Sequence, residues 1–293
     1  MEINKLDAVA IVGLGLLGGS LGLALQRSFP HINRLGYSHR VSTRNKALAT
    51  GTVDVVCGKL SDTVHSAQLV ILASPIGTFR ALMQEMADYL PDGCVVTDVG
   101  STKALPARLA GKHLPARVEF LGSHPIAGSE QRGVDFARAD LFDNANCLVT
   151  PTAKTAAKTR KFVTSFWQKL GMRTHTMSPA EHDRLLAQIS HLPHVVATAL
   201  VNSTRKEDML WCGKGFMDTT RIASGPSNVW RDILVANADQ SEKAIGRFIR
   251  ELNQIREVIR KNKDGKIQDL LESARRQRNE LVKKKLQRKE LPS

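Results

Sequence analysis

Cysteine and aromatic residues are scarce in this chain of 293 residues. The sequence has four cysteines, and aromatic residues make up 5% of it. The cysteines lie far apart and form no CxxC pair, which argues against structural zinc and against a disulfide framework. The start of the chain, Met1–Lys5, also lacks the basic segment and apolar run of a secretory signal. We therefore expect a cytoplasmic protein with reduced thiols.

Charged residues are absent from the 18 residues between Ala8 and Leu25. A stretch of that length approaches the span of a membrane helix. Five of its residues are glycine, however, and they are spaced as in a phosphate-binding loop. Glycine at this density is typical of turns and close backbone approach, so we predict no membrane segment.

Positive charge is in excess, with a formal net charge of +14. Residues 255–293 carry 13 Lys and Arg against 6 Asp and Glu, so this tail supplies half of the excess. Nucleic acid is an unlikely ligand for it, because no aromatic residue is present there for bases to stack on. The remaining excess suits an anionic cofactor and an anionic substrate.

Short apolar runs alternate with helical stretches over residues 1–178. Such runs predict parallel strands covered by helices on both faces, a doubly wound α/β domain of the Rossmann type. After Ser178 the pattern is helical almost to the end of the chain, and Ser178, Pro179 and Glu181 have the spacing of a capping box. We therefore predict an all-α domain over residues 179–293. Its apolar faces exceed what one small domain can bury, which predicts a homodimer. The expected strands are Val9–Val12, Arg34–Tyr37, Leu69–Leu72, Val95–Asp98, Phe120–Gly122 and Cys147–Thr150, with Gly171–Thr176 as a possible last one.

A glycine loop follows the first expected strand and opens a helix. Gly13 suits a tight turn, Gly15 lets a pyrophosphate approach the backbone, and Gly18 lets the helix pack closely on the strand. Leu16 and Leu17 begin the helix, whose N-terminal amides favour phosphate. This context predicts a bound dinucleotide.

The turn after the second expected strand selects the cofactor. NAD enzymes carry an acidic residue there for the ribose hydroxyls. This chain has Ser38, His39 and Arg40 instead, and no acidic residue occurs between Asp7 and Asp54. A hydroxyl and a guanidinium suit a 2′-phosphate, so we predict NADP rather than NAD.

Three further segments lie where chemistry is expected. Asp98–Lys103 closes one strand and Gly122–Glu130 closes the next, at the sheet edge where doubly wound folds bind ligands. His124, held by the following proline in a predicted loop, is placed for proton transfer. His191 and His194 lie three residues apart on one helix face, where Pro193 is expected to kink the helix. We expect no metal site, and we assign no catalytic role to His31, His39, His65 or His113.

Together these segments resemble the prephenate/arogenate dehydrogenase family of tyrosine biosynthesis. The resemblance extends from Val9 to about Asp239 and includes several motifs in the family's order. They are the glycine loop, the strand end with Ser74 and Pro75, Asp98–Lys103, Ser123–Gly128, Ser190–His194, Gly215–Ala223 and Trp230–Asp232.

The resemblance implies oxidative decarboxylation with hydride transfer to the nicotinamide. His124 matches the catalytic base, and Ser101 matches the residue that shares the 4-hydroxyl of the substrate. His191 or His194, and Arg221, match residues near the substrate carboxylates. Ser129 and Glu130 follow the His124 motif and are included in the expected substrate shell, whereas Ser74 and Pro75 are expected to line the cofactor.

Two alternatives remain open at this point. Another small NADP oxidoreductase, such as a β-hydroxyacid dehydrogenase, would carry a similar glycine loop but a catalytic lysine in its helical domain. A non-catalytic dinucleotide sensor would not need the combination of Ser101, His124 and Arg221. The sequence does not distinguish prephenate from arogenate, which differ by a keto and an amino group, and Glu130 is compatible with either.

Overall fold

The computed structural model describes residues 3–128 and 131–288 of the chain. The chain forms two compact units, one up to Ala238 and the other from Asp239 onward. The boundary predicted at residue 178 lies inside the first unit and remains a prediction about domains.

A six-stranded sheet forms the centre of the first unit. Its strand order is β3-β2-β1-β4-β5-β6, and every neighbouring pair is parallel. This confirms the predicted parallel sheet, with the addition of the short strand β3, which no apolar run had indicated. The strands are β1 (Ala8–Val12), β2 (Asn33–Tyr37), β3 (Val55–Val56), β4 (Leu69–Leu72), β5 (Val95–Asp98) and β6 (Glu119–Phe120).

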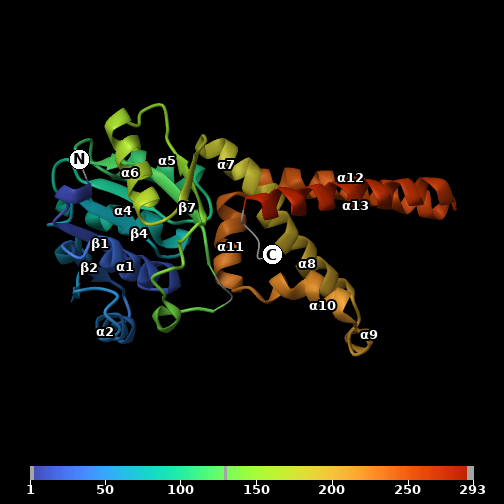
Figure 1. Cartoon of the computed structure of the whole chain (residues 1–293), viewed down its shortest axis with the longest axis horizontal. Coiled ribbons are helices and arrows are strands. Elements are labelled where there is room, and N and C mark those ends of the chain that lie inside the picture. Colours follow the sequence, from blue (N-terminus) through green and yellow to red (C-terminus); the bar gives the residue numbers. More distant parts are fainter. Residues whose placement is uncertain (1–2, 129–130, 289–293) are drawn as a thin grey trace. The chain divides into compact units, whose positions relative to one another are not determined.

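Helices cover both faces of this sheet, as its alternating side chains require. Val9 and Ile11 of β1 face one buried cluster, whereas Ala10 and Val12 face the other. The first cluster includes residues of α1 (Leu16–Ser28) and α6 (Ala157–Lys169). The second includes residues of α3 (Leu60–Val64), α4 (Phe79–Met86) and α5 (Ala104–His113), while α2 (Val41–Ala49) follows β2 (Figure 1). The doubly wound architecture is therefore confirmed.

A second, three-stranded sheet was not predicted. It consists of β7 (Gly122–Ile126), β8 (Asn146–Thr150) and β9 (Arg173–Thr176), with β7 antiparallel and β9 parallel to β8. The predicted strand Phe120–Gly122 is wrong in its bounds, because the chain leaves the main sheet after Leu121. Leu121 still donates to the Val96 carbonyl of β5, but Gly122 already pairs with β8.

His124 consequently lies on β7 and not in the predicted loop. Gly122 and Pro125 disguised this strand, since both residues usually interrupt strands. Pro125 is tolerated because β7 is an edge strand of its sheet. A strand holds the imidazole on a more rigid element than a loop does.

Helices follow from Ser178 onward, as predicted. The Ser178 hydroxyl accepts a hydrogen bond from the Glu181 amide, and Pro179 occupies the first turn of α7 (Pro179–Leu186). Residues 179–203 stay helical throughout, and the expected interruption at Pro193 takes the form of a π-helical turn, Ala187–His191, before α8 (Leu192–Ser203). The remaining helices of the first unit are α9 (Lys206–Met209), α10 (Lys214–Thr220) and α11 (Ser227–Ala236), and the short 3-10 helices are Ile3–Lys5, Ile76–Thr78, Ala87–Tyr89, Val134–Phe136 and Arg221–Ser224.

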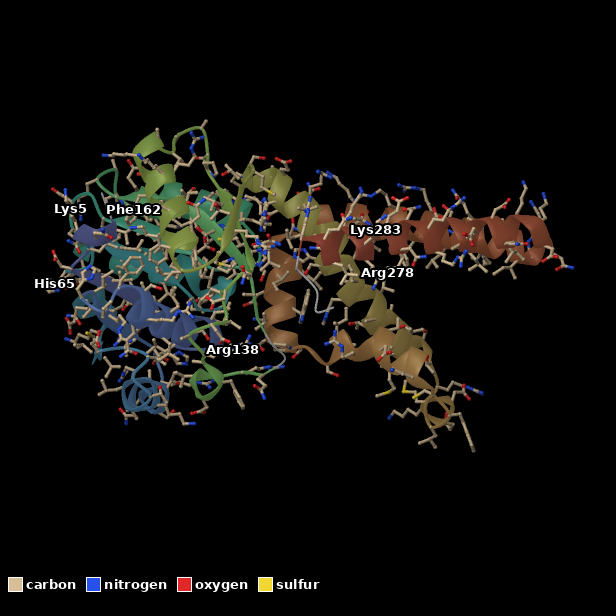
Figure 2. All side chains as sticks on the ribbon, viewed as in Figure 1. Lys5, His65, Arg138, Phe162, Arg278 and Lys283 are labelled. Carbon is tan, nitrogen blue, oxygen red and sulfur yellow. The ribbon has the colours of Figure 1, made fainter. Side chains whose placement is uncertain are left out.

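The second unit consists of two long helices, α12 (Ala238–Arg260) and α13 (Asp264–Gln287). The basic side chains of α13 are largely exposed, among them Arg278 and Lys283 (Figure 2). Among the described helices, none is both long and apolar enough to span a lipid bilayer.

Candidate active site

The glycine loop has the geometry of a phosphate cradle. Gly13 adopts a φ of +111°, a conformation that side chains disfavour. A Cβ on Gly18 would lie 1.9 Å from the Gly13 carbonyl oxygen, so loop and helix pack in backbone contact. Gly15 caps the N-terminus of α1, and a Cβ there would meet nothing within 4 Å. Gly15 therefore adjoins open space at the N-terminus of α1, and the helix amides that begin there, those of Leu16 and Leu17, suit a bound pyrophosphate.

The predicted ribose-selecting turn adjoins this loop, since the Gly13 amide donates to the Tyr37 carbonyl over 2.9 Å. Arg40 is the N-cap residue of α2, and its amide donates to the Ser38 hydroxyl over 3.4 Å. The Arg44 guanidinium donates to the Ser38 carbonyl over 2.6 Å and thereby braces the turn. His39 is exposed in the same turn.

Two other nearby cations are already used elsewhere. Arg34 is buried and ion-paired with Asp54, and Lys46 pairs with Asp135 over 2.6 Å. Arg40, by contrast, forms no ion pair with any of the residues described. Of the cations that follow β2, Arg40 is thus the one best placed for an anionic ribose substituent.

Ser74 and Pro75 follow β4 beside the glycine loop. A Cβ on Gly13 would lie only 2.5 Å from the Ser74 amide nitrogen, so the two segments are in close contact. The Ser74 and Thr78 hydroxyls are 2.8 Å apart, and Thr78 also donates to the Pro75 carbonyl over 2.7 Å. These bonds fix the strand end that is expected to line the cofactor.

A buried ion pair joins the segment of Ser101 to the strand of His124. Asp98, at the end of β5, pairs with Lys103, and both side chains are fully buried. Asp98 also accepts from the Ser123 amide over 3.3 Å, next to His124 in β7. Ser101 lies between the two members of the pair, so the structure brings the segments of the two expected catalytic residues together. The Ser101 side chain itself forms no hydrogen bond within residues 3–128 and 131–288.

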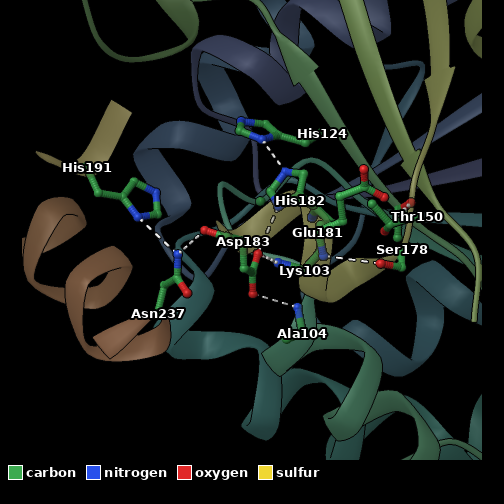
Figure 3. A network of polar contacts seen from close by, with 12 residues as sticks. Lys103, Ala104, His124, Thr150, Ser178, Glu181, His182, Asp183, His191 and Asn237 are labelled. Atoms are coloured by element: carbon green, nitrogen blue, oxygen red, sulfur yellow. Dashed lines mark hydrogen bonds and ion pairs between the residues drawn. The ribbon is translucent and has the colours of Figure 1, made fainter. Parts of the chain in front are cut away.

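His124 is the outer member of a hydrogen-bonded row (Figure 3). Its Nδ1 lies 2.9 Å from Nε2 of His182, and His182 Nδ1 lies 2.8 Å from the Asp183 carboxylate. The same carboxylate accepts the backbone amides of Lys103 over 2.7 Å and Ala104 over 2.9 Å. His182 and Asp183 are buried, whereas His124 is partly exposed at the end of the row.

Burial controls the protonation of these histidines. It lowers the pKa of His124 well below 6.5, and the electrostatic effects of His182, Lys103 and His191 lower it further. Burial likewise lowers the pKa of His182, although the hydrogen bond to Asp183 opposes this. His124 is therefore neutral at physiological pH and able to accept a proton.

His191 and His194 follow the π turn and are both buried. Burial lowers the pKa of His191 to about 4, and it also lowers the pKa of His194. Within the described ranges, His191 Nε2 and His194 Nδ1 are buried atoms that lack a hydrogen-bond partner. The His194 ring stacks on Trp230, with 3.6 Å between ring centroids. Two unsatisfied ring nitrogens are consistent with sites for substrate oxygens.

Arg221 begins the 3-10 helix Arg221–Ser224, and its neighbour Ile222 makes a backbone hydrogen bond to His194. Arg231, in the motif Trp230–Asp232, pairs with Asp232 over 2.6 Å. Ser129 and Glu130, which were expected near the substrate, lie outside the described residues. In the part of the chain that is described, no group of three or more potential ligand side chains is arranged for a metal ion.

Residues 21–176 match the family model described as the nucleotide-binding domain of prephenate dehydrogenase, and residues 178–273 match its dimerization domain. The chain belongs to the prephenate dehydrogenase family. The prephenate dehydrogenase of Bacillus subtilis is 35% identical over 260 residues, which cover 86% of this chain and 70% of that protein.

Solved structures of the family have the same fold. Prephenate dehydrogenase from Aquifex aeolicus, determined with hydroxyphenyl propionate and NAD+, is 34% identical with a TM-score of 0.88, covering 94% of this chain and 98% of that one. Arogenate dehydrogenase from Synechocystis is 29% identical with a TM-score of 0.81, covering 94% and 99%. This family member is therefore similar to enzymes named for either substrate.

Sequence reasoning missed four residues of the site in this prephenate dehydrogenase family member: His182, Asp183, Trp230 in its stacking role, and Asn237. His182 and Asp183 come directly after the predicted capping box, on a helix to which the sequence assigned only a structural role. A histidine next to an aspartate, in the first turns of a helix packed on a catalytic strand, is the signal that was available. Asn237 carried no signal, because its partners come from distant segments.

Proposed function

We propose that this chain oxidises prephenate, arogenate or both, with loss of the ring carboxylate as carbon dioxide. The products would be 4-hydroxyphenylpyruvate from prephenate and tyrosine from arogenate. Family membership supports the reaction class.

The observation that carries the proposal is the neutral, anchored imidazole of His124. It lies on β7 next to the carboxyl end of β5, near the edge where doubly wound sheets bind dinucleotides. Its pKa is lowered by burial, and its ring is held from behind by His182. A base that is neutral at working pH is what removal of a hydroxyl proton requires.

When bound, the nicotinamide would supply the acceptor for the hydride that leaves C4 of the substrate. In our proposal His124 takes the proton of the 4-hydroxyl, and the Ser101 hydroxyl shares that oxygen. Electrons released by loss of the ring carboxylate then flow to the C4 oxygen, which recovers the proton from His124 and becomes a phenol. Arg221 offers a guanidinium for a substrate carboxylate, and His191 and His194 offer ring nitrogens for substrate oxygens.

We further propose NADP as the cofactor. Ser38, His39 and Arg40 support it, since the turn carries a cation where NAD enzymes carry a carboxylate. The nearest acidic residue along the chain, Asp54, is paired with Arg34. The NAD+ in the Aquifex aeolicus structure belongs to that protein, so this preference is the finer part of the proposal.

We also propose a cytoplasmic homodimer. The matched dimerization model supports it, as does an exposed apolar stripe on α12. Successive members of the stripe are three or four residues apart, so they share one helix face. The stripe consists of Ile249, Leu252, Ile255 and Ile259, all exposed on the single chain.

One experiment tests the reaction, the substrate and the cofactor together. Purified protein is assayed against prephenate and arogenate, each with NADP and with NAD, by following absorbance of the reduced nicotinamide. We expect turnover with at least one substrate and a higher kcat/KM with NADP. The variant His124→Asn is the matched negative control. Absence of turnover with all four combinations, from a folded protein that binds cofactor, would rule the proposed reaction out.

A further inference from the structure

Asp183 determines which nitrogen donates and which accepts in each hydrogen bond between His182 and its neighbours. Its carboxylate is buried and accepts two backbone amides from the start of α5, those of Lys103 and Ala104. An ionised carboxylate can only accept hydrogen bonds. The remaining contact, with His182 Nδ1 at 2.8 Å, therefore requires that His182 carries its proton on Nδ1.

The order of donors and acceptors continues to His124. Burial keeps His182 neutral, so a ring protonated on Nδ1 has a bare Nε2. That nitrogen accepts, and its partner 2.9 Å away, His124 Nδ1, must donate. A neutral His124 with its proton on Nδ1 has its lone pair on Nε2, at the ring position facing away from His182 (Figure 3).

A second set of hydrogen bonds, which also starts at Asp183, places the proton of His191 on the other ring nitrogen. The Asn237 side-chain amide lies 2.8 Å from the Asp183 carbonyl and 3.2 Å from His191 Nδ1. A carbonyl only accepts, so the Asn237 nitrogen faces both partners and donates. His191 Nδ1 is then the bare nitrogen, and the proton of this neutral ring is on Nε2, the buried atom without a partner.

We propose that His182, Asp183 and Asn237 are positioning residues that fix opposite tautomers of His124 and His191. His124 presents a bare Nε2 that accepts a proton, and His191 presents an Nε2–H that donates a hydrogen bond to a substrate oxygen. This inference rests on the proposed function for its catalytic meaning, but the tautomers themselves do not depend on it.

The arrangement also stabilises the charge that develops on His124. Once Nε2 holds the substrate proton, the ring is an imidazolium whose Nδ1–H still donates to His182. The negative charge of Asp183 lies at the end of the row and favours this state. The proton on Nε2 returns to the product oxygen, so the row ends the cycle as it began.

The tautomers are measured directly by nitrogen-15 NMR of the wild-type protein labelled on histidine. The signals of His124 and His191 are assigned by their loss in His124→Asn and His191→Asn. We expect a protonated Nδ1 and bare Nε2 for His124, and the reverse for His191. The same protonated nitrogen in both rings would overturn the proposal, whether or not the protein turns over prephenate.

Two variants at one position test the positioning role. His182→Leu removes the acceptor for His124 Nδ1, whereas His182→Gln keeps one donor and one acceptor. We expect kcat to fall at least about tenfold in His182→Leu, up to the roughly 10²–10⁴-fold that a general base supplies, with unchanged affinity for NADP. His182→Gln should recover a large part of kcat and restore the bare Nε2 of His124.

His175→Leu is the matched control, because His175 is exposed on β9 and its ring hydrogen-bonds to Asn146, outside the row of His124, His182 and Asp183. It should keep the wild-type kcat. A wild-type kcat in His182→Leu would refute the positioning role. The positioning role would also be refuted if His182→Gln were as slow as His182→Leu while the tautomer of His124 stayed unchanged in both variants. Loss of activity in every variant with the expected tautomers present would count against the proposed function of His124 instead.

Discussion

The protonation of His124 makes a sharp prediction about pH. The His124 imidazole is titrated by measuring kcat/KM as a function of pH, because kcat/KM reports the pKa values of the enzyme before substrate binds. Its pKa is depressed by burial and by His182, Lys103 and His191, all of which oppose a positive charge on the ring. The active form is neutral, so the rate must be lost as pH falls through this lowered pKa.

The expected size follows from the comparison with an ordinary histidine. A base of pKa 6.5 would retain about half of its active form at pH 6.5 and about a tenth at pH 5.5. Because the pKa of His124 lies well below 6.5, wild-type kcat/KM should stay near its plateau at pH 6.5 and exceed a tenth of it at pH 5.5. His124→Asn should lower kcat by roughly 10²–10⁴ and abolish this dependence.

The assay is a series of initial rates between pH 5.5 and 8 in buffers of constant ionic strength, with cofactor saturating. Cofactor binding to His124→Asn is measured in parallel and should match the wild type, because the His124 ring bonds to His182 and forms no hydrogen bond to the glycine loop among the described residues. A midpoint at or above pH 6.5 would refute the argument from burial. Near-wild-type kcat in His124→Asn would refute the assignment of the base.

Three further results are expected. Arg40→Ala should weaken the binding of NADP by about 1.5–3 kcal/mol and leave the binding of NAD nearly unaffected, as steady-state kinetics with each cofactor will measure. An equal or better kcat/KM with NAD in the wild type would contradict the proposed preference. Leu252→Glu should shift the protein from dimer to monomer in light scattering, whereas Gln254→Glu, on the opposite face of α12, should not; a wild-type monomer at micromolar concentration would remove the dimer. Acid should destabilise the fold, because the folded state resists protonation of His191, whose pKa falls from 6.5 to about 4. The unfolded state then binds more protons below pH 6.5, and the free energy of unfolding should drop by roughly 2 kcal/mol between pH 7.5 and 5, as urea titrations at the two pH values will test.

The sequence predicted the main sheet because its strands are nearly continuous apolar runs. Val9–Val12 and Leu69–Leu72 are buried on both faces, and such strands need no partner information to be recognised. The sequence did not predict β7, because this strand is not a continuous apolar run. Its residues Gly122–Ile126 include glycine, histidine and proline, and pairing with β8 outweighs their local preferences.

The candidate site divides in the same way. His124, Ser101 and the glycine loop stand next to strand ends, where local sequence and topology together indicate ligand contact. His182 and Asp183 act through contacts with β7 and α5, 58 and about 80 residues away along the chain. No period or short motif encodes such distances. Only the packing of α7 against the first 150 residues brings these side chains together.

The π turn Ala187–His191 sets the rotation about the helix axis between two pairs of side chains. His182 and Asp183 precede it, whereas His191 and His194 follow it on the same continuous helix. A π turn holds one residue more than the α-helical turn that it replaces, and each residue of an α-helix advances by about 100° around the axis. Inserting one further residue between the two pairs, with the π turn kept, would therefore rotate the later pair by about 100° relative to the earlier pair. His191 would then swing away from Asn237 while His182 kept its contact with His124. A substitution along this helix removes one contact at a time, whereas an inserted residue uncouples the proton acceptor from the hydrogen-bond donor.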